Sequence, residues 1–230
     1  MILLGNRLKA EALIFDFDGV IVDTEPLHYK SFQRVLEPLE LGFSWRDYVD
    51  TYMGYDDRDA FVEAFEAGGR KINSDDLLSL IRQKALLFQD VIRDGVSAYP
   101  GVIDLIHRLR AEKIPLAICS GALRSDIDPI LAILGLEECF DIIVTAEDVS
   151  RSKPDPECYQ LALDKLCRLY KIPHAKSSTI AIEDTPAGII SAKLAGIQVI
   201  AVSNSYPPEN LSDASFVTDS LESLVDFVFI

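Results

Sequence analysis

Acidic side chains follow two apolar runs of this 230-residue chain, at residues 12–15 and 179–182, at the point where each run ends. If these runs are neighbouring strands of a parallel sheet, the acids meet at its carboxyl edge, where open α/β folds bind ligands. Such carboxylates would repel one another unless a cation joined them, and oxygen ligands without His or Cys favour Mg²⁺. The sequence therefore predicts a magnesium site. Its residues are Asp16, Asp18, Glu183 and Asp184.

A magnesium site of this kind favours phosphate chemistry, in which the metal neutralises charge on phosphoryl oxygens. The chemistry needs a further positive group, and Lys153 stands in the stiff segment Ser152-Lys153-Pro154-Asp155-Pro156. The alternative is a solvent-exposed lysine beside a helix start. Ser120 and Gly121 follow another apolar run, 116–119, and by themselves fit a turn or a helix cap as well as a ligand contact.

The elements that must position these residues alternate along the chain. Short apolar runs at 12–15, 116–119, 142–144, 179–182 and 197–202 are of strand length and rich in Ile, Val or Phe. Runs without polar alternation are typical of strands covered on both faces. Helical patterns lie between several of them, at 102–112, 155–171 and 185–195. This order predicts an α/β fold with a doubly wound parallel sheet.

Residues 25–96 interrupt that alternation. Their apolar residues keep helical spacing, with one face on Phe61, Ala64 and Phe65 and another on Leu77, Leu78, Ile81, Ala85 and Phe88. We expect an all-helical insert at 25–96, and an α/β core made of residues 1–24 and 97–230.

Composition limits the partners and the compartment. The 22 basic and 37 acidic residues give a net charge of −15, which disfavours nucleic acid and anionic membrane as partners. The N-terminal apolar stretch is too short for a signal peptide, and no apolar run reaches 18 residues, so we expect a cytoplasmic protein that does not span a membrane. We expect the four cysteines to be reduced thiols. They are Cys119, Cys139, Cys158 and Cys167.

The motifs also resemble a known family. The stretch Asp16-Phe17-Asp18-Gly19-Val20 through Glu25 is similar to the nucleophile loop of the haloacid dehalogenase-like superfamily. The later motifs match in order: Ser120-Gly121, Lys153-Pro154, and Glu183-Asp184-Thr185-Pro186-Ala187-Gly188. The insert resembles the superfamily's helical cap. The resemblance covers essentially the whole chain and is nearest to the β-phosphoglucomutase and phosphoglycolate-phosphatase-like group.

The resemblance implies a role for each matching residue. Asp16 is the nucleophile that forms an aspartyl-phosphate, and Asp18 is the general acid and base. That acid role leads us to expect a raised pKa for Asp18. Mg²⁺ takes the carboxylates of Asp16 and Asp184 and the backbone carbonyl of Asp18, with Glu183 either a ligand or its neighbour. Ser120, Gly121 and Lys153 hold the transferring phosphoryl group.

Cap residues enter the prediction by the same resemblance. Thr24 lies at the hinge where the insert begins, His28 couples cap closure to the acid and base, and Lys84 reaches the active site. The mutases carry an Arg after the glycine at position 54 and a lysine after the second strand, which grip a second phosphate. Here those positions are Asp57 and Leu123, and Arg58 and Arg124 are the neighbouring residues that would have to compensate.

The resulting prediction is a Mg²⁺-dependent phosphatase of a small phosphorylated metabolite, of the sugar or polyol phosphate type. One alternative is a β-phosphoglucomutase-like sugar phosphomutase that uses the same aspartyl-phosphate. The other is a non-catalytic binding protein on the same fold, which loss of Asp16 or Asp18 would have indicated.

Overall fold

A six-stranded parallel sheet forms the centre of the protein. The computed structural model describes residues 2–4, 8–53, 55–92, 95–171, 178–224 and 228–229. The strand order is β5-β4-β3-β6-β7-β8, and every neighbouring pair is parallel. The bounds are β3 Ala12–Phe15, β4 Leu116–Cys119, β5 Ile142–Val144, β6 Thr179–Glu183, β7 Gln198–Val202 and β8 Phe216–Thr218. The predicted fold class is confirmed.

Helices cover both faces of this sheet because its central strands are apolar on both sides. In β3, Leu13 and Phe15 belong to one buried cluster, and Ala12 and Ile14 belong to the other. The first cluster includes α5 (Val102–Ala111) and α6 (Arg124–Leu134). The second includes α7 (Glu157–Tyr170) and α9 (Pro186–Leu194). This double layer fixes the carboxyl ends of the strands, where the candidate site lies.

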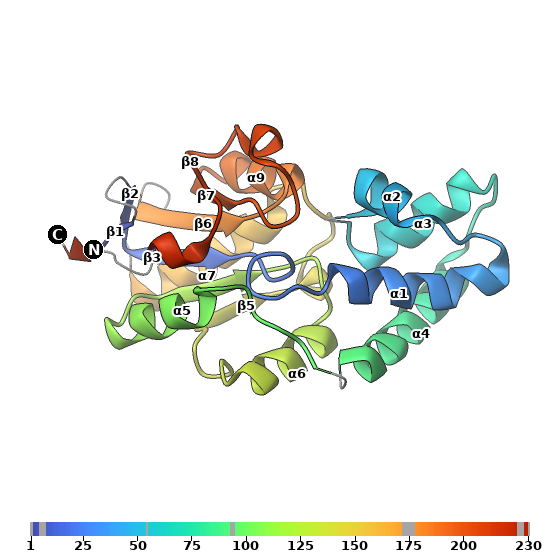
Figure 1. Cartoon of the computed structure of the whole chain (residues 1–230), viewed down its shortest axis with the longest axis horizontal. Helices are drawn as coiled ribbons and strands as arrows, with labels where there is room; N and C mark the ends of the chain where they lie inside the picture. The colour runs from blue at the N-terminus through green and yellow to red at the C-terminus, as the bar shows by residue number, and fades with distance from the viewer. Residues whose placement is uncertain are drawn as a thin grey trace.

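The inserted segment is helical. It contains α1 (Glu25–Leu36), α2 (Trp45–Asp47), α3 (Asp57–Ala67) and α4 (Ser74–Ile92), with a 3-10 turn at Glu37–Leu39 and a π-helical turn at Tyr48–Tyr52. These helices lie together at one end of the molecule, opposite the two termini (Figure 1). They share a separate apolar cluster, centred on residues such as Phe32, Leu36 and Phe61.

The buried face of α4 differs from the predicted one. Leu78 is 50% exposed, although its spacing placed it on the apolar face, and Lys84 is fully buried. The reason is that the inward face carries a charged network: the Lys84 ammonium lies over the rings of Phe32 and Phe88 and reaches polar partners. Of the predicted face, Leu77, Ile81 and Phe88 pack in the apolar clusters as expected, and only the placement of Leu78 was wrong.

A second, antiparallel sheet joins the two ends of the chain. It contains β1 (Ile2–Leu4), β2 (Leu8–Ala10) and β9 (Val228–Phe229), and its order is β2-β1-β9. The remaining 3-10 turns are Ala146–Asp148, Pro208–Leu211 and Leu221–Leu224. Among the described residues, no helix is both long and apolar enough to cross a membrane.

Candidate active site

The loop after β3 carries Asp16, and its path depends on a glycine at position 19 and on a hydrogen bond from Asn204. Gly19 has a φ of +78°, and a Cβ at this position would lie 1.9 Å from Oδ2 of Asp184. Only glycine therefore fits both the backbone conformation and the space. The side-chain amide of Asn204 donates to the Gly19 carbonyl at 2.6 Å, which anchors the loop to the segment after β7. Asn204 was not predicted, because it belongs to no recognisable motif.

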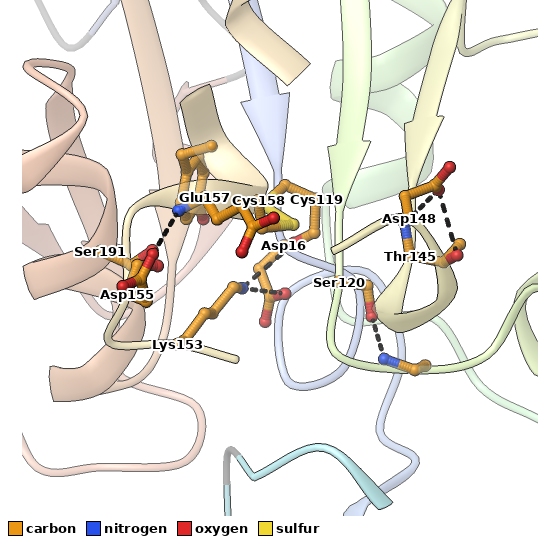
Figure 2. Close-up of a disulfide and its surroundings, with 12 residues drawn as sticks. Asp16, Cys119, Ser120, Thr145, Asp148, Lys153, Asp155, Glu157, Cys158 and Ser191 are labelled. Atoms are coloured by element: carbon orange, nitrogen blue, oxygen red, sulfur yellow. Dashed lines mark hydrogen bonds and ion pairs between the residues drawn. A yellow bond between two sulfur atoms is a disulfide. The ribbon is translucent and has the colours of Figure 1, made fainter. Parts of the chain in front are cut away.

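Lys153 holds the first of the acids in place. Its Nζ lies 2.7 Å from Oδ1 of Asp16 and 3.1 Å from the Cys119 carbonyl (Figure 2). It also lies 2.7 Å from Oε1 of Glu183. Burial raises the pKa of Asp16 to about 8, and Lys153 opposes this rise. Burial alone would lower the pKa of Lys153, but the charges of Asp16 and Glu183 raise it, so the ammonium stays protonated.

The Lys153 loop is attached on both sides. The Ser152 hydroxyl donates to Oδ2 of Asp59 in α3, so the loop contacts the helical insert. The Ser191 hydroxyl of α9 donates to the Asp155 carbonyl at 2.6 Å. The peptide bond between Lys153 and Pro154 is cis. The lysine is therefore a buried, positioned group, and the solvent-exposed alternative is excluded by its 8% exposure.

Both oxygens of Glu183 are occupied by protein donors. Oε1 accepts from Lys153 and, at 2.9 Å, from the Tyr159 hydroxyl. Oε2 accepts from the backbone N–H groups of Asp184 and Thr185 and from the Thr185 hydroxyl. With its acceptor positions filled, Glu183 positions Lys153 and the Asp184 backbone in this arrangement. Tyr159 was missed by the sequence analysis, because an aromatic residue at helical spacing indicated only core packing.

Asp184 has the free acceptor atoms that a metal would need. It is fully buried, and neither carboxylate oxygen has a hydrogen-bond partner among the described residues. Burial, together with the charges of Asp16 and Glu183, raises its pKa well above the usual value. One oxygen from each of these three acids lies within 4.8 Å of the others. An all-oxygen, acidic site with orphaned acceptors fits a hard divalent cation such as Mg²⁺.

Asp18 is held by the helical insert and has a different pKa from the one expected. Its Oδ1 accepts from the Thr24 hydroxyl and lies 3.3 Å from Nε2 of His28. Burial alone would raise the pKa of Asp18, but His28 and the hydrogen bonds from His28 and Thr24 lower it below its usual value. The expectation of a raised pKa was wrong, because these donors stabilise the carboxylate.

Lys84 and His28 extend this contact into α4 and α3. Lys84 Nζ lies 2.7 Å from Nδ1 of His28 and 2.7 Å from Oδ1 of Asp57. Because an ammonium only donates, Nδ1 must accept, which leaves the Nε2–H of His28 to donate to Asp18. The His28 ring stacks on Phe88 with 4.2 Å between centroids. His28 and Lys84 are thus brought together at Asp18.

Ser120 and Gly121 lie at the carboxyl end of β4. The Ser120 side chain is buried and its Oγ accepts from the Ala122 N–H at 2.9 Å, so the turn that was expected from sequence is present. Gly121 lines the same cavity as Asp16, Asp18 and Lys153, while its backbone faces Asp56.

Two cysteines beside this turn form a disulfide, contrary to the expectation of four reduced thiols. Cys119 at the end of β4 is joined to Cys158 in the first turn of α7 (Figure 2). Their Cα atoms lie 6.0 Å apart because α7 packs on β4 next to the sheet's carboxyl edge. Cys139 and Cys167 are free. The spacing of 39 residues offers no sequence signal for this pairing.

The two arginines expected to compensate for a lost phosphate grip do not reach the Asp16 cavity. Arg58 donates to the Ser150 carbonyl at 3.3 Å and lies 4.0 Å from Asp56. Arg124 is half exposed and pairs with Asp128 at 2.8 Å, one turn along α6. Arg124 has a partner on its own helix, and its part in a second anion contact stays a prediction. Gly54, which the comparison with the mutases used, lies outside the described residues.

A further buried pair closes the cavity from the insert. Glu25, in the first turn of α1, accepts from the Tyr48 hydroxyl. Burial raises the pKa of Glu25, and His28 opposes the rise. Tyr206, after β7, donates to the Val49 carbonyl at 3.3 Å and so links the core to the insert. Neither tyrosine had a sequence signal, since aromatic residues are usual in a core.

Known proteins share both sequence and fold with this chain. The family model described as haloacid dehalogenase-like hydrolase matches residues 13–202. A phosphorylated carbohydrates phosphatase of Thermotoga maritima is 31% identical over 191 residues, which are 83% of each protein. The β-phosphoglucomutase of Clostridium difficile has a TM-score of 0.83 at 24% identity, over 94% of this chain and 93% of that one. CbbY of Rhodobacter sphaeroides, solved with xylulose-(1,5)bisphosphate, has a TM-score of 0.82 at 23% identity, with coverage of 93% and 95%.

The family match spans more than half of the chain and includes Asp16, Lys153 and Asp184. This protein therefore belongs to the haloacid dehalogenase-like hydrolases. The family assignment inferred from the motifs is confirmed, and the chain is an enzyme of that hydrolase family. The alternative of a non-catalytic binding protein is set aside.

Proposed function

We propose that this protein is a Mg²⁺-dependent phosphatase that hydrolyses a small phosphorylated metabolite, of the sugar or polyol phosphate type. The observation that carries the proposal is the pairing of Lys153 with Asp16 beside the partnerless Asp184 carboxylate. A carboxylate nucleophile, a fixed cation and a vacant set of oxygen ligands are what phosphoryl transfer to an aspartate requires. The related phosphatase of Thermotoga maritima supports the same substrate class.

Two carboxylates carry out the proposed reaction: Asp16 attacks phosphorus, and Asp18 transfers protons. An Asp16 oxygen attacks phosphorus, the bond from phosphorus to the leaving oxygen breaks, and Asp18 donates its proton to that oxygen. Bound phosphate adds negative charge beside Asp18 and so raises its pKa toward the protonated state that this step needs. Asp18 then accepts a proton from water, whose oxygen attacks phosphorus and releases phosphate and free Asp16. Bound Mg²⁺ would supply positive charge that lowers the pKa of Asp16, so that it attacks as a carboxylate, and that offsets its repulsion from the substrate.

The phosphoryl oxygens need donors that are already in place. We assign this role to Lys153 and the Gly121 N–H, which line the Asp16 cavity, and to the Ser120 hydroxyl, which lines a small cavity together with them. Asp16, Asp184 and the Asp18 carbonyl are the proposed metal ligands, and Glu183 positions them through its hydrogen bonds to Lys153 and the Asp184 backbone.

We propose that residues 25–96 act as a cap on a core made of residues 1–24 and 97–230. The cap supplies Glu25, His28 and Asp57 to the cavity that holds Asp16. Because His28 of the cap contacts Asp18, opening of the cap would release Asp18 from this donor, while Thr24 at the hinge keeps its own contact with Asp18. Thr24 is thus proposed to orient Asp18 in addition to lying at the hinge.

A phosphomutase is the second candidate, favoured by the similarity of fold to β-phosphoglucomutase. A mutase must hold a second phosphate while the first is transferred. Asp57 and Leu123 stand where that grip would be, and Arg124 pairs with Asp128 instead. We therefore favour hydrolysis over transfer to a second hydroxyl.

The deciding experiment compares phosphate release with isomerisation. Wild-type protein is incubated with β-glucose 1-phosphate, catalytic glucose 1,6-bisphosphate and Mg²⁺, and in parallel with a panel of sugar and polyol monophosphates. Release of inorganic phosphate, lost in Asp16→Asn, is the expected result. Accumulation of glucose 6-phosphate with little free phosphate would establish the mutase instead. Beryllium fluoride should bind at Asp16 in a crystal of the wild type.

A further inference from the structure

A second cavity adjoins the one around Asp16, and Asp57 lines both. The Asp16 cavity has a volume of about 50 Å³, whereas the second has about 570 Å³, a size that suits a small-molecule ligand. The larger cavity lies between α3 and α4 of the insert and the loops after β4 and β5. Asp57 is therefore placed where a leaving group would pass from the reacting phosphate toward the larger space.

One carboxylate oxygen of Asp57 accepts no hydrogen bond from the described residues. Oδ1 accepts from Lys84 at 2.7 Å, but Oδ2 is buried and has no hydrogen-bond partner among the described residues. A buried acceptor without a donor costs free energy, and native proteins rarely leave one unpaired. Asp57 lines both cavities, so a ligand that enters there can bring the missing donor close to this covered oxygen.

The charges around the second cavity do not favour an anion. Its lining includes three acids, Asp56, Asp57 and Glu147, against two arginines, Arg58 and Arg82. Arg58 already donates to the Ser150 carbonyl. The rest of the lining is partly apolar, with Ile81, Leu86 and Leu123 among its residues. A carbon chain fits this lining, and a second phosphate would meet the Asp57 carboxylate.

We propose that Asp57 selects the substrate by its leaving group, accepting a hydrogen bond from a hydroxyl or ammonium group and disfavouring a second phosphate. This inference rests on the proposed phosphatase function and narrows its substrate class to monophosphates whose leaving group carries a donor. Asp57 also holds Lys84, which contacts His28. Selection must therefore be separated from that structural role.

A series of matched substrates distinguishes substrate selection by Asp57 from its structural role in holding Lys84. The substrates are n-alkyl phosphates of three to six carbons that end in a methyl, hydroxyl, ammonium or second phosphate group. In the wild type, kcat/KM should be roughly tenfold or more higher for the hydroxyl and ammonium compounds than for the methyl compound of equal length. The bisphosphate should be the poorest substrate. A bisphosphate preferred over the methyl compound would overturn the proposal without any variant.

Variants of Asp57 then test whether the substrate preference depends on this residue. In Asp57→Ala the preference for both donors should fall to about onefold, and in Asp57→Asn the hydroxyl preference should persist while the ammonium preference falls. The exposed Asp75 on α4 provides the control, because Asp75→Asn should keep every ratio. If Asp57 only holds Lys84, all substrates lose activity together and the ratios stay constant, which overturns the proposal. Release of phosphate from p-nitrophenyl phosphate, measured alongside, shows whether phosphatase activity itself is present; its absence in the wild type overturns both proposals.

Discussion

The ammonium of Lys153 lies 2.7 Å from Oδ1 of Asp16, and both groups are buried at the carboxyl edge of the sheet. The same ammonium contacts Glu183 at 2.7 Å and lies 5.1 Å from the centroid of the Tyr159 ring. One cation therefore compensates two buried carboxylates. Removing it would affect both the reaction and the fold, since a buried charge without its partner is costly.

Replacement of Lys153 by Met should lower kcat/KM by roughly 10²–10³, the usual cost of losing one positioned electrostatic contact. It should also lower the free energy of unfolding by about 3–5 kcal/mol, because Asp16 and Glu183 lose their shared partner. Steady-state kinetics and urea unfolding measure the two effects. Lys193→Met, at a surface lysine of α9, should leave both unchanged. Unaltered kinetics in Lys153→Met would remove Lys153 from the proposed mechanism.

Gly188→Ala should disturb the site without changing any charged group. A Cβ on Gly188 would lie 1.8–2.2 Å from the carboxylate atoms of Glu183, so that side chain must move away from Lys153 and Tyr159. We expect a loss of about 1–3 kcal/mol in unfolding free energy and, from the displaced lysine, a fall in kcat/KM of about tenfold or more. Ile190→Ala on the exposed side of the same helix is the control. Equal effects of the two substitutions would contradict the role given to Glu183.

Asp184→Asn should have opposite effects on the metal-free and metal-bound protein. Without metal, burial raises the pKa of Asp184, so the folded chain keeps a proton that the unfolded chain has lost; the substitution removes this cost and should raise the free energy of unfolding by about 1–3 kcal/mol. Mg²⁺ should raise the melting temperature of the wild type, with about 2.7 kcal/mol gained at 100 times Kd, and leave that of the variant unchanged. Thermal melts in EDTA and in MgCl₂ test both halves, with the exposed Asp213→Asn as control. Equal Mg²⁺ responses in wild type and Asp184→Asn would refute the metal assignment.

The sequence allowed the central strands and their order in the chain to be predicted. The runs at 12–15, 116–119 and 142–144 coincide with β3, β4 and β5, because strands covered on both faces contain almost no polar residues. The edge strand β8 was missed, since its three residues are only partly buried and its segment has no apolar run. The terminal sheet was missed for a similar reason: strands of two or three residues have too short a pattern.

The residues of the site that belong to sequence motifs could be predicted, whereas the contacts that depend on tertiary packing could not. Asp16 and Asp184 were expected to lie together from their positions after strands, and Lys153 was expected beside them from the family motif; the structure brings the three together. The burial of Lys84 depends on partners far away in the chain, at His28 and Asp57, which helical spacing cannot indicate. The lowered pKa of Asp18 likewise depends on donors that the insert supplies.

Because of Asp126, in the first turn of α6, the free energy of unfolding should decrease as the pH rises from about 4 to 6. It is 1% exposed, its Oδ2 has no hydrogen-bond partner among the described residues, and burial raises its pKa to about 6, although Lys84 and His28 oppose the rise. Between the unfolded value near 3.8 and the folded value, the native state keeps a proton that the unfolded state has lost. The free energy of unfolding therefore decreases with pH in this window, by at most about 3 kcal/mol.

Comparison with Asp126→Asn isolates that contribution from the other acids of the site. Urea unfolding of both proteins in EDTA, from pH 4 to pH 8, should give a difference that changes in favour of the variant up to about pH 6 and is constant above it. Asp128→Asn changes an exposed acid on the same helix, paired with Arg124, and should follow the wild type within about 1 kcal/mol at every pH. Parallel curves for the wild type and Asp126→Asn would mean that the Asp126 carboxyl has the same pKa in the folded and unfolded chains. That result would contradict the prediction that burial raises the pKa of Asp126.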